Sequence, residues 1–125
     1  MFNFEKLDVW HKSVEFADQV CRLTRSFPDA ERFGLTNQMR RAAVSVSSNI
    51  AEGSSRSSKI GFARFIEIAT GSVFEVISQA TISKRQGLLS DDAFAQLYAA
   101  AEEQSKMLSG LKRSLNSQLS TLNPA

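Results

Sequence analysis

The chain has few residues that could hold a metal ion or form a cross-link. Its 125 residues include one cysteine, Cys21, and one histidine, His11. A single cysteine cannot form an internal disulfide, so we expect a reducing compartment and a cytoplasmic protein. These two residues also cannot supply the ligand set of a usual zinc site. We therefore expect no metal site and no cofactor.

Long apolar runs and catalytic motifs are missing as well. The first residues, MFNFEK, contain no apolar signal core, and no segment reaches the ~20 apolar residues of a membrane span, so we expect no membrane partner. The phosphate-binding motifs GxGxxG and GxxxxGKS/T, the zinc motif HExxH and Glu-x-x-His pairs are all absent from the sequence. An enzyme is consequently a disfavoured alternative, and we predict no catalytic residues.

Prolines and glycines are scarce, with two of the former and six of the latter, while 42% of the residues are hydrophobic. No segment alternates apolar and polar residues as a half-buried strand would. Apolar residues recur instead at spacings of three and four, which predicts four helices at 7–25, 36–53, 59–85 and 90–116. The fold class is therefore all-α, with one helical domain at 1–116 and a polar tail at 117–125 that we expect to fray.

Residues suited to helix ends mark the boundaries of these segments. An N-cap side chain accepts a bond from a free backbone amide, and a C-terminal glycine adopts a conformation that other residues avoid. In the connector before the second helix, Phe33 and Leu35 are expected to pack against the core. The expected N-caps are Thr36, Ser57 or Ser58, and Ser90, and the expected terminal glycines are Gly53 and Gly87.

The second predicted helix has two faces that could both be packed. One is an ordinary apolar stripe that includes Met39, Val46 and Ile50. The other consists of small residues, which let a second backbone approach closely. Its members are Val44, Ser48, Ala51 and Ser55. We predict that this small stripe takes part in an oligomer interface.

The third predicted helix is apolar around most of its circumference, which is typical of a helix buried on several sides. Ile68 and Phe74 lie off its main apolar face, and we assign both to the predicted oligomer interface with Val44, Ser48 and Ala51. Gly71 lies near the middle of the helix, where glycine costs about 1 kcal/mol relative to alanine. We expect a close helix approach at Gly71 to offset that cost.

Positive charge is concentrated in one segment. The net charge is +2, but residues 32–64 contain six Lys or Arg and one Glu, a local net charge of +5. This excess predicts a basic surface for nucleic acid or for intersubunit contacts, formed by Arg40, Arg41, Arg56, Lys59 and Arg64. The alternatives are a solvated helix face, salt bridges to the acidic first 31 residues, or pairs between Arg40, Arg41 or Arg64 and the carboxylates of Glu52, Glu67 and Glu75.

A series of motifs resembles one bacterial family. They are FEKLDVW (4–10), FP (27–28), FGLTNQMRRAAVS (33–45), SNIAEG (48–53), FIEIA (65–69), GS (71–72) and GLL (87–89). Together they resemble the four-helix-bundle proteins first noticed as reading frames inside intervening sequences of large-subunit ribosomal RNA genes. The resemblance covers about residues 2–115. It implies an antiparallel up-down-up-down four-helix bundle and, in relatives, a ring-shaped homopentamer. A related branch, the accessory variability protein of diversity-generating retroelements, pairs with a reverse transcriptase and carries a basic surface for nucleic acid.

These observations favour a non-enzymatic, oligomeric binding or assembly module. Its partners would be further copies of itself, in a pentamer, and a nucleic acid or nucleoprotein. The main alternative is a pure protein–protein scaffold whose basic residues form intersubunit salt bridges. The position of the basic residues, on one exposed surface or buried against acids, separates these two interpretations.

Overall fold

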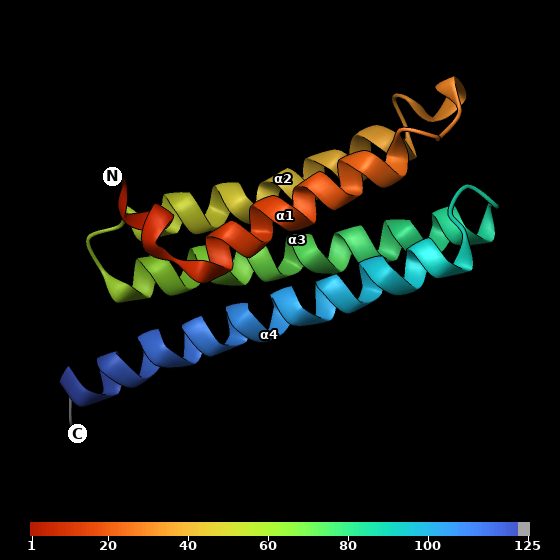
Figure 1. Ribbon diagram of the computed structural model, residues 1–125. Coiled ribbons are helices and arrows are strands. Elements are labelled where there is room, and N and C mark those ends of the chain that lie inside the picture. Colours follow the sequence, from red (N-terminus) through yellow and green to blue (C-terminus); the bar gives the residue numbers. More distant parts are fainter. Residues whose placement is uncertain (123–125) are drawn as a thin grey trace.

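Residues 1–122 are described by the computed structural model, and within them the chain forms four long helices and no strand. The helices are α1 (Asp8–Thr24), α2 (Leu35–Ser54), α3 (Lys59–Arg85) and α4 (Asp91–Leu122). The helices alternate in direction, so the α1–α2 and α3–α4 connections lie at one end of the molecule and both termini at the other (Figure 1). The predicted all-α antiparallel four-helix bundle is confirmed. Two short 3-10 helices, η1 (Asn3–Lys6) and η2 (Asp29–Glu31), precede α1 and α2.

The core lies along the apolar stripes that the sequence predicts. Among the four long helices, α2 packs most extensively on α3, whereas α1 and α4 pack less closely on each other. Side chains of all four helices are fully enclosed, among them Val20, Met39, Val46, Ile50, Ile66, Val76, Leu97 and Leu108. Burial of this apolar surface is the dominant favourable contribution to folding.

Three predicted helix ends are confirmed. The Ser58 Oγ accepts a hydrogen bond from the Gly61 N–H at 3.0 Å and so caps α3. The Ser90 Oγ accepts one from the Ala93 N–H at 3.1 Å before α4. Gly87, with φ of 77°, follows the end of α3 and adopts the left-handed conformation that glycine tolerates best.

The predicted capping roles at both ends of the second helix are wrong, although the ends lie within one residue of the predicted bounds. α2 begins at Leu35, so Thr36 is a buried residue inside it and not its N-cap. The Glu31 carboxylate accepts a hydrogen bond from the Leu35 N–H at 3.4 Å, which provides one of the free amides with a partner. At the other end α2 continues to Ser54, and Gly53 is a buried helical residue against α3. The absence of a side chain at Gly53 serves helix packing and not helix termination.

A further packing prediction is wrong, and another is not met within the single chain. Phe33 is 85% exposed and does not pack against the core. Leu35 does pack against the core, as predicted. A Cβ atom at Gly71 would have no neighbour within 4 Å among the described residues, so no close approach within the chain offsets the cost of this glycine. The close approach occurs at Gly53 instead, where a Cβ would lie 2.7 Å from the Phe65 Cβ.

α4 extends past the predicted boundary between bundle and tail. Residue 116 lies inside this helix, which continues to Leu122, while residues 123–125 of the predicted tail lie outside the described residues. Gln104, the polar residue of the otherwise apolar α4 stripe, is buried. Its Nε2 donates to the Val9 carbonyl oxygen at 3.3 Å and thereby links α4 to α1.

Candidate interaction surfaces

The five predicted basic residues do not form one surface. Arg40 and Arg41 lie in the first part of α2, near the α1–α2 connection, whereas Arg56, Lys59 and Arg64 lie around the α2–α3 connection. These connections are at opposite ends of the bundle (Figure 1). Arg41 and Ser54 are 13 residues apart in one helix, or roughly 20 Å at 1.5 Å per residue. The basic residues therefore form two separate groups.

Arg40 is a structural residue. Its Nε donates to the Thr24 Oγ1 at 2.9 Å, and its Nη2 donates to the Cys21 carbonyl oxygen at 3.4 Å. Both acceptors belong to α1 and both are neutral. Arg40 thus links α2 to α1 without a carboxylate, which differs from the predicted salt bridges to the acidic first segment.

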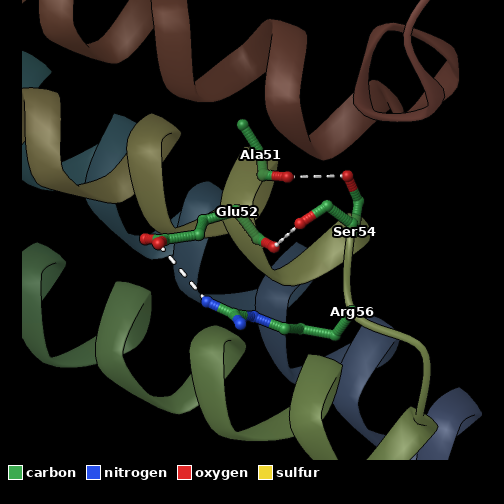
Figure 2. A network of polar contacts seen from close by, with 5 residues as sticks. Ala51, Glu52, Ser54 and Arg56 are labelled. Atoms are coloured by element: carbon green, nitrogen blue, oxygen red, sulfur yellow. Dashed lines mark hydrogen bonds and ion pairs between the residues drawn. The ribbon is translucent and has the colours of Figure 1, made fainter.

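Arg56 is held in place by two contacts. Figure 2 shows its side chain reaching back to the Glu52 carboxylate, with 3.3 Å between Arg56 Nη2 and Glu52 Oε1. The guanidinium carbon also lies 4.5 Å from the centre of the Phe65 ring, an arrangement that favours a cation–π interaction. Both charged side chains are about half exposed, so the pair contributes little to stability, typically about 0–1 kcal/mol.

The serine cluster next to Arg56 forms the end of a helix. The Ser54 Oγ donates to the Ala51 carbonyl oxygen at 2.8 Å, and the Ser55 Oγ donates to the Glu52 carbonyl oxygen at 2.7 Å. These bonds give partners to terminal carbonyls of α2, and Figure 2 shows the first of them. The serines therefore have a local structural role.

The predicted pairing of Glu52, Glu67 and Glu75 with Arg40, Arg41 or Arg64 is wrong. Glu52 pairs with Arg56, and Glu67 pairs with Lys112 of α4 at 2.8 Å, so neither binds Arg40, Arg41 or Arg64. The hydrogen bond from Lys112, followed by its positive charge, lowers the pKa of the Glu67 carboxyl. Glu75 forms no ion pair within residues 1–122.

Three of the basic residues carry unpaired charge. In the part of the chain that the structure describes, Arg41, Lys59 and Arg64 make no ion pair. Arg41 and Arg64 are exposed, and Lys59 is half-buried. Lys59 and Arg64 lie in the first two turns of α3, whereas Arg41 is near the other end of the bundle. Of the five predicted basic residues, these three are the ones that an anionic partner could bind without breaking an ion pair or hydrogen bond between described residues.

The predicted interface residues lie on the surface. Val44, Ile68 and Phe74 are each about half exposed or more, Ser48 is exposed and Ala51 is half-buried. A shallow depression of about 450 Å³ lies beside the small stripe, lined by Arg40, Arg41, Val44, Ser45 and Ser48. Packing among the described residues therefore leaves much of these apolar side chains exposed.

The third helix presents its exposed apolar residues on two flanks. Ile68 is three residues after Phe65 and four before Ser72, both of which contact α2, so it lies on the α2 side. Phe74 lines a groove with Tyr98 of α4.

The exposure of Phe33 was not predicted from the sequence, because an aromatic residue in a short connector has no periodic pattern to show which way it faces.

Neither a metal site nor a membrane span occurs among the described residues. Those residues contain no group of three or more His, Cys, Asp or Glu side chains placed to hold a metal ion. The His11 Nε2 donates to the Glu5 carbonyl oxygen at 2.6 Å. Among the helices of residues 1–122, none combines the length and apolar character needed to cross a bilayer.

A comparison with protein-family models decides the family of the chain. The model of the 23S rRNA-intervening sequence protein family matches residues 5–110, from η1 into the second half of α4. The chain belongs to this family. The match confirms the resemblance that the motifs carry, and it covers every residue predicted for the basic surface and for the oligomer interface.

A solved structure resembles this member of the 23S rRNA-intervening sequence protein family. It is a protein of unknown function from the S23 ribosomal protein family of Bacteroides thetaiotaomicron, with a TM-score of 0.78 and 22% sequence identity. The alignment covers 84% of this chain and 95% of that chain. At this identity the likeness shows the fold alone. The comparison with curated proteins gives no match.

Proposed function

We propose that this protein is a non-enzymatic cytoplasmic assembly module that associates with copies of itself into a pentamer. The supporting observation is the exposure of large apolar side chains on well-formed helices, with Phe74 at 60% and Ile68 at 52%. Burial of such side chains contributes roughly 25 cal/mol per Å² of apolar area. The small stripe of α2 would let a second backbone approach closely. The pentameric form is the one that the family resemblance implies.

The mass of the protein in solution tests this proposal. We expect light scattering behind size-exclusion chromatography, at micromolar concentration, to give five times the 13.8 kDa of one chain. A mass of 13.8 kDa across the accessible concentrations would contradict self-association. A different stable multiple would retain self-association and reject the pentamer.

A second candidate function is nucleic-acid binding at one end of the assembly. Lys59 and Arg64 are unpaired within the described residues, and Arg56 lies beside them with an exposed side chain. An oligomer would repeat this group in every subunit, which raises the effective concentration of phosphate contacts. The pure scaffold remains the alternative, and the enzymatic alternative is disfavoured by the absence of catalytic motifs from the sequence.

Salt-dependent binding tests the second candidate. Fluorescence anisotropy with single- and double-stranded RNA and DNA should show weak sequence preference and affinity that falls steeply with salt. Replacement of Arg56, Lys59 and Arg64 by alanine should reduce the slope of log K against log salt by about 0.9 for each phosphate that the variant no longer binds.

A matched variant controls for net charge in this experiment. Replacement of Arg22, Arg25 and Arg85 by alanine removes the same charge at the opposite end of the bundle and should leave the slope unchanged. Absence of binding at tens of micromolar protein favours the scaffold. An equal loss in both variants would show that total charge, and not this surface, drives binding.

A further inference from the structure

Two grooves flank α3 at the same level of the bundle. α3 lies between α2 and α4 (Figure 1). The α2/α3 groove has a volume of about 590 Å³, and the α3/α4 groove about 320 Å³. Glu75 lines the first and Phe74 lines the second. Because these residues are consecutive in α3, the two grooves lie side by side at one height along the bundle axis.

The α2/α3 groove contains unpaired groups of both charges. Arg41 of α2 and Glu75 of α3 line it, and in residues 1–122 neither forms an ion pair with the other or with any other side chain. Phe33 stands at its rim with 85% of its surface exposed, and the Arg32 guanidinium lies 5.5 Å from the ring centre. The groove thus has an aromatic ring, a free cation and a free carboxylate.

Gln79 of α3 adds an unsatisfied polar atom to the lining of the α2/α3 groove. Its Oε1 is the one buried side-chain oxygen or nitrogen of the described residues that has no hydrogen-bond partner. Gln79 lines this same groove. A buried acceptor without a donor is unfavourable, so a contact that turns the Gln79 side chain toward a donor would stabilise it.

The α3/α4 groove has the same three elements. Its floor is apolar, and the rings of Phe74 and Tyr98 are both about half exposed at its edges. Glu102 and Lys106 line it from α4. Their spacing of four residues in a helix would allow them to pair with each other, but no ion pair joins either of them to any described residue.

We infer that the α2/α3 groove of one copy binds the α3/α4 groove of a second copy. This inference rests on the proposed self-assembly and names the two surfaces that meet. Opposite charges would pair across the contact, Arg41 with Glu102 and Glu75 with Lys106, while Phe33 packs beside Phe74 and Tyr98. Each of the four charges lacks an ion-pair partner among residues 1–122 and gains one in the pair.

The position of the grooves is compatible with a closed ring. The two surfaces differ, so the contact is heterologous, and each copy uses one surface for each neighbour. Grooves on neighbouring sides of a four-helix bundle face directions roughly a right angle apart. A head-to-tail contact between such faces turns each copy relative to the one before it, as a closed ring requires. The equal height of the two grooves keeps the copies in one plane.

Two variants that each damage one surface test the inference. Phe33→Asp places a carboxylate at the rim of the α2/α3 groove, and Phe74→Asp places one in the α3/α4 groove. Each variant alone should give a 13.8 kDa monomer by sedimentation velocity and native mass spectrometry. An equimolar mixture at high micromolar concentration should give a 1:1 heterodimer, because one intact pair of surfaces remains. A larger ring should not form.

Other outcomes contradict the inference in different ways. If either variant keeps the mass of the original protein, the corresponding groove is not an interface, although self-assembly stands. If both variants are monomeric and the mixture stays monomeric, the two grooves do not bind each other. If the variants form homodimers, the contacts are isologous. If the original protein is itself monomeric, the proposed function fails together with this inference.

A third variant and a folding measurement complete the experiment. Ile60 is an exposed apolar residue in the first turn of α3, 14 residues or roughly 20 Å along the helix from Phe74, so Ile60→Asp should retain the original mass. All three substitutions replace exposed side chains, and far-UV circular dichroism should show unchanged helix content. A variant that loses helix content is replaced by Arg41→Glu for the first groove or Lys106→Glu for the second, with the same expected masses.

Discussion

Replacement of Gly53 by alanine is expected to destabilise the bundle by about 1–2 kcal/mol, although alanine is the better helix former. The new Cβ would lie 2.7 Å from the Phe65 Cβ and 3.1 Å from the Phe62 Cδ1. The Phe65 Cβ is fixed by its own backbone, so α2 and α3 must move apart to relieve the contact. Urea unfolding followed by circular dichroism measures the loss.

Gly110→Ala is the matched substitution in this comparison. Gly110 lies inside α4. A Cβ added there would have the Arg113 Nη2 as its nearest neighbour, at the ordinary contact distance of 3.9 Å. Alanine should therefore stabilise the protein here by up to about 1 kcal/mol. A stabilising effect at Gly53 would show that α2 and α3 can separate without cost, and that the close approach is not a constraint on the fold.

Two isoleucines of α3 are expected to differ sharply when each is shortened to alanine. Ile66 is fully buried and Ile68 is 52% exposed. Ile66→Ala should leave a cavity and lower the free energy of unfolding by about 2–5 kcal/mol. Ile68→Ala should change the stability of the subunit by no more than about 0.5 kcal/mol, as is usual for surface positions.

Protein concentration separates the two effects. If subunits associate, the unfolding midpoint of the original protein rises with concentration, because association stabilises the folded state by mass action. Ile68→Ala should weaken that dependence, whereas Ile66→Ala should lower the midpoint at every concentration. Equal losses for the two variants at low concentration would mean that Ile68 is packed within the subunit.

Local patterns predicted the helices because each helix is stabilised by an apolar stripe that is visible in the sequence. Ser58, Ser90 and Gly87 were predicted correctly because a cap and a left-handed glycine depend on the nearest few residues. The roles of Thr36 and Gly53 were not predicted correctly, because the extent of α2 depends on packing against its neighbours and on Glu31 outside the helix. Local preference alone could not decide those two ends.

The candidate surfaces were only partly predictable. Val44, Ile68 and Phe74 were identified as residues off the core-facing stripes, and the structure leaves them exposed. The five basic residues were treated as one group because they are close in sequence, yet the length of α2 separates them in space. The neutral partners of Arg40 on α1 have no signal in sequence spacing, since they lie 16 and 19 residues away.

The sequence by itself determined the helix count, the all-α class, the core stripes and the family, because these follow from periodicity and motif order along the chain. Tertiary structure alone decided which glycine is a close contact, which cations stay unpaired, and that Phe33 faces solvent beside a groove with an unpaired glutamine oxygen. The physical reason is that desolvation and steric contact depend on atoms from distant segments. Their positions are fixed only when the helices pack.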